Sequence, residues 1–226
     1  MPGYYEEKLA AERLRRCYEV APPRVRRHLD AEIRFVRERI RPGALVLELG
    51  CGYGRVLRDL ASAALVLVGI DTSCASLRLA LETLRNETTC HLAAMDALHL
   101  GCRDGMFDLV ACIQNGISAF HVDQRALLEE AVRVTRSGGV VLFSSYLESF
   151  WAHRIEWFRI QAAHGLLGEI DESASGDGVI VCKDGFRATT LGRSRFAQLT
   201  EKIGGTVAMH EIDGSSLFCE ILRDRA

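Results

Sequence analysis

The chain has 226 residues and sets 28 Lys and Arg against 30 Asp and Glu, for a formal net charge of −2. This length fits one domain or at most two, and 48% hydrophobic with 26% charged residues is typical of a globular protein. These values exclude disorder, collagen and coiled coil for the whole chain. They also supply no general attraction to nucleic acid or to anionic membranes.

No run approaches the roughly 18 consecutive apolar residues that a membrane helix needs. The chain begins Met-Pro-Gly-Tyr-Tyr-Glu-Glu, which has neither the basic nor the apolar part of a secretion signal. We therefore expect a soluble, cytoplasmic protein. The eight cysteines include no Cys-x-x-Cys pair, which favours reduced thiols in the core over a disulfide framework or a zinc site.

The first 42 residues are expected to be helical. Between Pro22-Pro23 and Pro42-Gly43, apolar residues recur every three or four positions, which predicts one long amphipathic helix. The residues of this stripe are Val25, Leu29, Ile33, Val36 and Ile40. A shorter helix is expected upstream, around residues 9–18.

The next hundred residues alternate between two patterns. Five apolar runs predict strands, at residues 45–49, 65–70, 90–93, 107–113 and 140–144. Helical stretches lie between them, at residues 55–61, 74–85 and 123–135. Continuous apolar strands that alternate with helices indicate a doubly wound parallel sheet covered on both faces.

The last third has a different character. Residues 146–175 are expected to be helical and aromatic, and a helix is expected near residues 196–203. Asp184-Gly185 and Asp213-Gly214 each separate two short apolar runs and predict two β-hairpins. An α/β core that ends in antiparallel strands follows, with no linker that would divide the chain.

The first predicted strand leads into a glycine-rich loop, Gly50-Cys51-Gly52-Tyr53-Gly54. Ligands bind at the carboxyl ends of strands in open parallel sheets, and glycines let the backbone approach them. The dinucleotide fingerprint fits only in part, because Arg55 stands where its last glycine is required. Asp71 ends the second strand, where it could accept hydrogen bonds from a ribose diol or cap the next helix.

Five motifs in order resemble those of the class I S-adenosylmethionine-dependent methyltransferases, over about residues 25–145. Residues 47–54 resemble motif I, and Gly69-Ile70-Asp71 resembles the motif that follows it. Asp96-Ala97 is similar to the adenine-side acidic motif, and residues 107–110 with Gln114-Asn115 resemble motif IV. Residues 136–140 resemble the turn into the fifth strand.

The resemblance implies a mostly parallel, seven-stranded, Rossmann-like sheet with an antiparallel C-terminal strand, N-terminal helices and a helical insert after the fifth strand. It implies one domain, residues 1–226. We divide it into a helical cap (1–42), a cofactor-binding core (43–145), a helical insert (146–178) and C-terminal antiparallel strands with a helix (179–226).

The resemblance also implies contacts with S-adenosylmethionine and its product S-adenosylhomocysteine. Glu48 would hold the ammonium group, Asp71 the ribose and Asp96 the adenine amino group, while Gln114 would lie beside the transferred methyl. The full set of expected contacts is Tyr18, Glu48, Gly50, Cys51, Gly52, Tyr53, Gly54, Asp71, Thr72, Asp96, Ala97 and Gln114. Simple packing for Tyr18, a surface carboxylate for Asp96 and a turn former for Gln114 are the alternatives.

The expected reaction is an in-line displacement at the sulfonium methyl group, for which the protein supplies alignment and, where needed, a proton acceptor. No metal is expected. Candidates for a base are His121, His153 and Tyr146. The aromatic insert could form the wall of an acceptor pocket or simply pack on the sheet, and Arg55 is expected toward the rim of the cleft.

A small-molecule acceptor is the leading expectation, with no nucleic acid or membrane partner and a monomer or homodimer. Asn115-Gly116-Ile117 differs from the Asn/Asp-Pro-Pro-aromatic signature of enzymes that methylate amino groups of nucleic acids and glutamine. Methylation of tRNA or protein, and a non-catalytic S-adenosylmethionine-binding regulator, are the alternatives. An aminopropyltransferase, which uses the decarboxylated cofactor, fits Glu48 less well.

Overall fold

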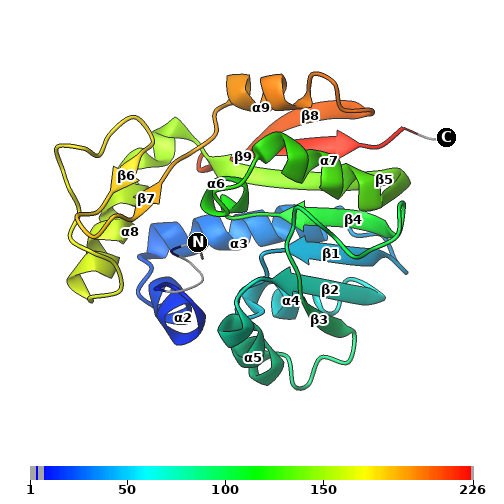
Figure 1. The fold of residues 1–226 in the computed structure, drawn as a ribbon, viewed down its shortest axis with the longest axis horizontal. Coiled ribbons are helices and arrows are strands. Elements are labelled where there is room, and N and C mark those ends of the chain that lie inside the picture. Colours follow the sequence, from blue (N-terminus) through cyan, green and yellow to red (C-terminus); the bar gives the residue numbers. More distant parts are fainter. Residues whose placement is uncertain (1–3, 5–7, 225–226) are drawn as a thin grey trace.

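The structure is a computed structural model that describes Tyr4 and residues 8–224. Within these residues, seven strands form one sheet in the order β3-β2-β1-β4-β5-β9-β8 (Figure 1). Its strands are β1 (Leu45–Leu49), β2 (Val66–Asp71), β3 (Cys90–Ala94), β4 (Phe107–Cys112), β5 (Thr135–Tyr146), β8 (Thr206–Ile212) and β9 (Ser216–Leu222). The first five are parallel and β9 is antiparallel to both of its neighbours, so the predicted fold class is confirmed.

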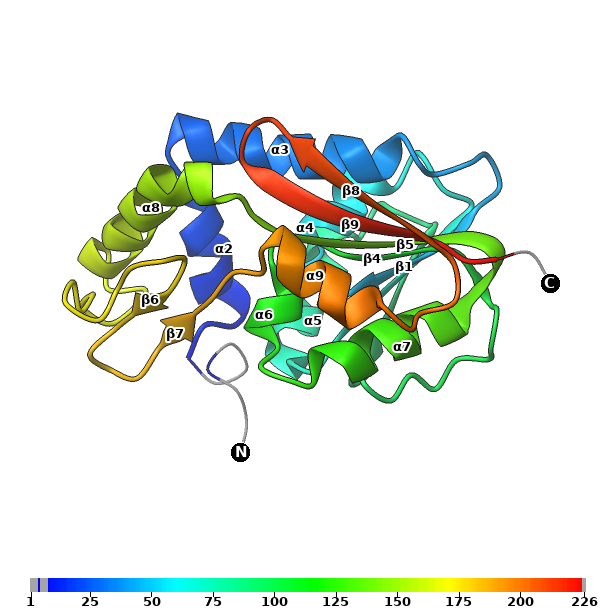
Figure 2. The same cartoon turned by 90° about the horizontal axis from the view of Figure 1, so that it is seen from above.

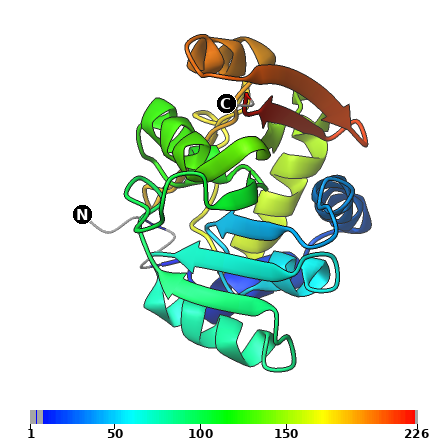
Figure 3. The ribbon, with the colours of Figure 1, turned by 90° about the vertical axis from the view of Figure 1, so that its right-hand side faces the viewer.

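Helices cover both faces of this sheet (Figure 3). They are α2 (Ala11–Glu19), α3 (Pro23–Arg37), α4 (Arg55–Leu60), α5 (Cys74–Thr83), α6 (Gly116–Ala119), α7 (Gln124–Val134), α8 (Trp151–Ala163) and α9 (Arg193–Thr200), with a 3-10 turn η1 (Glu148–Phe150). One buried apolar cluster joins α3, α4 and α5 to the sheet, and another joins α7 and α9 to its other face. The strands between them are apolar on both sides because both of their faces are buried.

A third buried cluster forms a cap beyond the carboxyl ends of the parallel strands. It unites α2, the start of α3, α8 and a small hairpin of β6 (Ile180–Val181) and β7 (Arg187–Ala188). Figure 2 shows these elements gathered at one end of the sheet. The cap therefore lies over the edge where a doubly wound sheet binds its ligands.

Three details differ from the sequence prediction. β5 starts at Thr135, directly after α7, with a register shift opposite Asp108. A Cβ atom at Gly139 would lie 2.9 Å from the Asp108 carbonyl oxygen, so glycine permits this strand to begin early. The insert helix is shorter than predicted, and the first hairpin belongs to the cap rather than to the main sheet.

None of the helices in residues 8–224 is long and apolar enough to cross a bilayer. Of the first seven residues, on which the absence of a secretion signal was predicted, only Tyr4 lies within the described structure. All eight cysteines are free, five of them buried, as expected for thiols that serve as small core side chains.

Candidate functional site

A cavity of about 430 Å³ lies at the carboxyl ends of the strands, under α2 and α8. Residues after β1, β2, β3 and β4 line it, and so does the last residue of β5. The predicted site residues that line it are Tyr18, Glu48, Gly50, Cys51, Gly52, Tyr53, Asp71, Thr72, Asp96, Ala97, Gln114 and Tyr146. Gly54 does not line the cavity; with a φ of 81° it turns the chain into α4.

The glycine loop is held tightly against β2. The backbone N–H groups of Gly50 and Cys51 both donate to the Ile70 carbonyl oxygen at 2.9 Å. Gly50 has a φ of 73°, and a Cβ atom there would lie 2.5 Å from Cζ of Phe120. Glycine is required at this position for the turn and for the close approach of the Phe120 ring.

Asp71 joins this loop to the end of β2. Its Oδ2 atom accepts the Gly52 N–H at 2.9 Å, and its Oδ1 atom accepts the Ser73 N–H at 2.8 Å. The N-cap of α5 is Ser73, whose Oγ accepts the Ser76 N–H. The alternative that Asp71 caps this helix is therefore wrong. The carboxylate faces the cavity while it fixes the loop.

Glu48 is a buried carboxyl at the floor of the cavity, with a side chain that is almost fully shielded from solvent. Its Oε2 atom has no hydrogen-bond partner among the described residues. Burial raises the pKa of Glu48 to about 8, and the nearby positive charge of Arg55 opposes that rise. A cationic ligand group would satisfy this oxygen and favour the ionised carboxylate.

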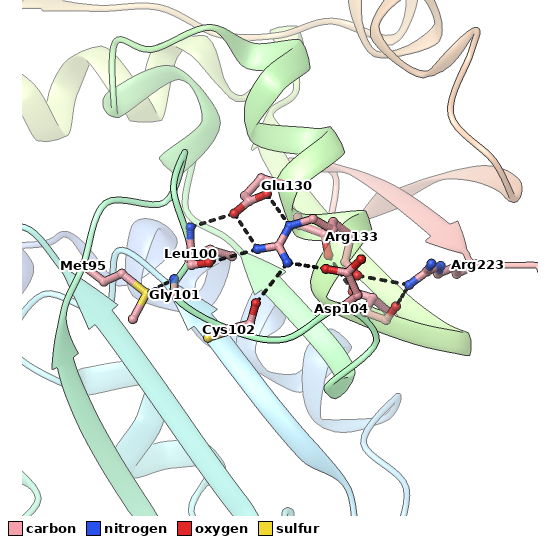
Figure 4. A network of polar contacts seen from close by, with 10 residues as sticks. Met95, Leu100, Gly101, Cys102, Asp104, Glu130, Arg133 and Arg223 are labelled. Carbon is pink, nitrogen blue, oxygen red and sulfur yellow. Dashed lines mark hydrogen bonds and ion pairs between the residues drawn. The ribbon is translucent and has the colours of Figure 1, made fainter.

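Asp96 and Ala97 lie on the segment after β3, at the other end of the cavity. The Asp96 carboxylate is half exposed and accepts the Leu98 N–H at 2.9 Å. Arg133 of α7 fixes the rest of this segment (Figure 4). Its guanidinium donates to the carbonyl oxygens of Leu100 and Cys102 at 2.9 and 3.0 Å.

The same network is reinforced by carboxylates. Glu130 pairs with Arg133 at 2.7 Å and accepts the Leu100 N–H at 2.7 Å (Figure 4). Asp104 pairs with Arg133 at 2.5 Å, and this arginine's own carbonyl oxygen accepts from Arg223. The segment that carries Asp96 is thus tied to α7 and to the chain after β9.

Gln114 lies in a strained turn after β4. It has a φ of 57° and Asn115 has a φ of 63°, a left-handed conformation that costs non-glycine residues energy. The Gln114 N–H donates to Oε2 of Glu32 at 2.7 Å and to Oγ of Ser144 at 2.8 Å. The Gln114 side-chain Nε2 is buried without a partner among the described residues.

Glu32 holds the turn that carries Gln114, and the sequence analysis did not identify it. It is completely buried on α3, and burial raises its pKa to about 7. A sequence signal existed, since Glu32 stands three residues after Leu29 on the apolar stripe of the helix. A carboxyl on such a stripe needs a partner inside the protein.

The cap supplies an aromatic roof. Tyr18 of α2 lies 5.9 Å from the Trp157 ring and 6.1 Å from the Tyr53 ring, measured between ring centroids. The Trp157 indole N–H donates to the Cys17 carbonyl oxygen at 2.9 Å and ties α8 to α2. Aromatic residues of α8 therefore line the cavity, and α8 packs in the cap with α2, the start of α3 and the β6–β7 hairpin rather than on the sheet.

The three base candidates differ in their position relative to the cavity. His121 is exposed, with a φ of 54°, and His153 lies on the outer side of α8, 4.0 Å from the Glu156 carboxylate. Neither histidine lines the cavity, whereas Tyr146 does. The Tyr146 ring stacks on the buried His28 with centroids 5.1 Å apart.

Within the described residues, no group of three or more His, Cys, Asp or Glu side chains is arranged to hold a metal ion.

Comparison with known proteins gives one family match. Residues 46–139 match the model of a methyltransferase domain, a range that contains the glycine loop, Asp71, Asp96 and Gln114.

Two curated relatives match part of the chain. One is 2-methyl-6-phytyl-1,4-hydroquinone methyltransferase of Synechocystis, 29% identical over 135 residues, or 55% of this chain and 42% of the relative. The other is ubiquinone biosynthesis O-methyltransferase of Paraburkholderia xenovorans, 35% identical over 106 residues, or 46% and 44%. The chain thus spans less than half the length of either relative.

Solved structures share the fold over nearly the whole chain. The N-methyltransferase NodS of Bradyrhizobium japonicum, in complex with S-adenosylhomocysteine, is similar with a TM-score of 0.63 at 17% identity. The match covers 96% of this chain and 95% of NodS, so it includes the cap as well as the sheet.

Proposed function

We propose that this chain is a class I, Rossmann-like methyltransferase, which transfers a methyl group from S-adenosylmethionine to a small molecule. One observation carries the proposal. Residues predicted from four separate motifs, which follow four different strands, line a single cavity at the carboxyl ends of the sheet. Strand ends of an open parallel sheet are where such folds bind ligands.

The residues of the cavity fit the cofactor. Glu48 provides a buried carboxylate oxygen that lacks a partner within the described chain, which suits an ammonium group. The Gly50 turn brings backbone to the cavity wall, and the Asp71 carboxylate lines it at the end of β2. Asp96 and Ala97 line the far end beside Met95, where the adenine ring of the cofactor would pack and be recognised.

S-adenosylmethionine, when bound, supplies an activated methyl group and a good leaving group. The protein's part is then to bind and to align. Glu48 would hold the ammonium group, Asp71 the ribose hydroxyls and Asp96 the adenine amino group. The Glu32 carboxyl would act through the backbone of Gln114 by holding its turn beside the acceptor.

The acceptor side of the cavity favours an aromatic small molecule. Tyr18, Tyr146, Trp157 and Phe158 line it, and flat rings pack well against such side chains. The two curated relatives are named for a hydroquinone and for ubiquinone biosynthesis, which agrees with an aromatic acceptor.

An acceptor that loses a proton on methylation calls for a proton acceptor within the cavity. Tyr146 is the base candidate that the cavity brings into reach, and we propose it as the residue to test. We further propose a cytoplasmic enzyme, since eight free thiols suit a reducing compartment, acting as a monomer or homodimer.

Calorimetry with S-adenosylmethionine and S-adenosylhomocysteine tests the proposal first. A homocysteine-release screen over phenols, thiols, amines and carboxylates then identifies the acceptor class. We expect micromolar binding and release with an aromatic acceptor. Binding without release in any class would favour a macromolecular acceptor or a non-catalytic regulator, and no binding at millimolar ligand would refute the proposed function.

A further inference from the structure

Gln161 lies on the inward face of α8, where the helix covers the cavity. The buried residues of this helix recur at helical spacing, and Gln161 follows Trp157 by about one turn. Only 3% of Gln161 is exposed, and it lines the cavity together with Trp157 and Phe158. The helix therefore brings one carboxamide to a wall whose other α8 residues are aromatic.

The polar groups that share this face of α8 have partners inside the protein. The Trp157 indole N–H donates to the Cys17 carbonyl oxygen at 2.9 Å, and the Arg154 guanidinium donates to the Gly178 carbonyl oxygen at 2.7 Å. The Gln161 amide, in contrast, enters no hydrogen bond among the described residues. A buried amide without a partner costs free energy, so Gln161 is suited to a polar group that a ligand brings into the cavity.

The chemistry of the amide limits what that group can be. A carboxamide is neutral, its oxygen accepts hydrogen bonds and its NH₂ group donates them. A hydroxyl group both donates and accepts, so it can pair with either end of the Gln161 amide. A carboxylate or an ammonium group would meet no opposite charge on Gln161, which favours a neutral hydroxyl group as its partner.

The position of Gln161 separates this contact from the reacting atom. Gln114 lines the cavity from the turn after β4, whereas Gln161 lines it from the cap. The transferred methyl group is expected beside Gln114. The group that meets Gln161 therefore belongs to a part of the acceptor that does not react.

We infer that Gln161 is a specificity-determining residue, which binds a hydroxyl group of the acceptor away from the atom that is methylated. The inference rests on the proposed function and deepens it, because the acceptor is then an aromatic compound with such a second group. An analogue without this hydroxyl group would leave the amide unpaired. Sites built for a hydrogen bond reject their analogues in this way.

The test compares phenol with catechol, resorcinol and hydroquinone, each of which adds one hydroxyl group to the ring. The four compounds are titrated by calorimetry into protein saturated with S-adenosylhomocysteine. Wild type should bind at least one of the three diols about five- to fifty-fold more tightly than phenol. Gln161→Met keeps the length of the side chain and removes the amide, so it should bind that diol and phenol about equally.

Two further variants separate the amide from shape and from general effects of the substitution. Gln161→Leu is a second apolar replacement with a different shape, and it should lose the same preference. Gln198→Met makes the matched change at an exposed position of α9 and should keep the wild-type preference.

Two measurements on Gln161→Met check where the amide acts. Its affinity for S-adenosylhomocysteine should equal that of wild type, because the amide is assigned to the acceptor. Its midpoint of thermal unfolding without ligand should equal or exceed that of wild type, because a buried amide without a partner has been removed.

The possible results have different meanings. If wild type shows no preference for any diol, or if both folded Gln161 variants or Gln198→Met contradict the expected pattern, the inference is overturned alone. Weaker binding of S-adenosylhomocysteine by Gln161→Met would overturn it as well, because the amide would then serve the cofactor, and a lowered midpoint would show that the amide has a partner in the protein. If wild type binds no S-adenosylhomocysteine, the proposed function fails and the inference falls with it.

Discussion

The buried carboxyl of Glu48 predicts that the ligand-free protein is destabilised by its own binding site. Burial raises the pKa of Glu48 from its usual 4.5 to about 8. The folded protein then holds this proton over a pH range in which the unfolded chain has released it. Stability is fully present below pH 4.5 and falls as the pH rises toward 8.

The size of the effect follows from these two pKa values. Each pH unit between them removes about 1.4 kcal/mol of stability, so at pH 7 the loss is about 3 kcal/mol. Glu48→Gln keeps the shape and the neutral state of the side chain. We expect it to be about 3 kcal/mol more stable than wild type at pH 7 and equal to it near pH 4.

Urea unfolding of the ligand-free proteins between pH 4 and pH 8.5 measures this difference directly. Binding offers a second measurement, because an ammonium group beside Glu48 would drive its proton off. Calorimetry of S-adenosylhomocysteine in two buffers of different ionisation enthalpy should show about one more proton released by wild type than by Glu48→Gln at pH 7. Equal pH profiles of stability, together with equal proton release, would refute the reasoning.

Three further substitutions test the loops of the cavity. Gly50→Ala should destabilise the protein by at least about 2 kcal/mol, because its Cβ atom would meet the Phe120 ring. Gly43 has a similar φ and open space around it, so Gly43→Ala in urea unfolding measures how much of the loss comes from the backbone alone. Asp71→Ala should weaken S-adenosylhomocysteine binding by about 1.5–3 kcal/mol, and unchanged affinity of the folded variant by calorimetry would contradict the proposed contact of Asp71 with the ribose. Glu32→Gln keeps an oxygen for the turn after β4 and removes a carboxyl whose pKa is raised from 4.5 to about 7. In the same unfolding assay its free energy of unfolding should exceed that of wild type by about 3 kcal/mol at pH 7 and equal it near pH 4. A constant difference across that range would show that ionisation is not the cause.

The sheet could be predicted because its signals are local. Each parallel strand is a short apolar run bounded by a turn, and the glycine loop and Asp71 follow two of these runs directly. Carboxyl ends of parallel strands meet at one edge, so residues after separate strands could be placed together without knowing any contact. The same reasoning predicted that Gln114, which follows the fourth strand, lies at this edge.

The contacts that depend on tertiary packing were not accessible in this way. Glu32 reaches the turn after β4 from a helix before β1, and no spacing in the sequence connects the two positions. Arg55 was expected toward the rim of the cleft, and only the structure shows that it lines the cavity with its guanidinium over the Tyr18 ring. The two histidines were chosen by residue type, whereas their exposure depends on how α6 ends and on which side of α8 faces out.

The place of β9 in the sheet has a consequence for the order in which this protein can fold. β9 fills the position next to β5, but α8, the β6–β7 hairpin, α9 and β8 are all made between them. Until β9 emerges, β5 presents an open edge that can pair with a wrong strand or another chain. The strands β1 to β4, whose following loops line the cavity, have all their partners among themselves and β5. This half of the sheet can thus assemble from local contacts while the chain is still being made. The end of β5, with Tyr146, gains its partner Ser216 only after a long-range pairing step.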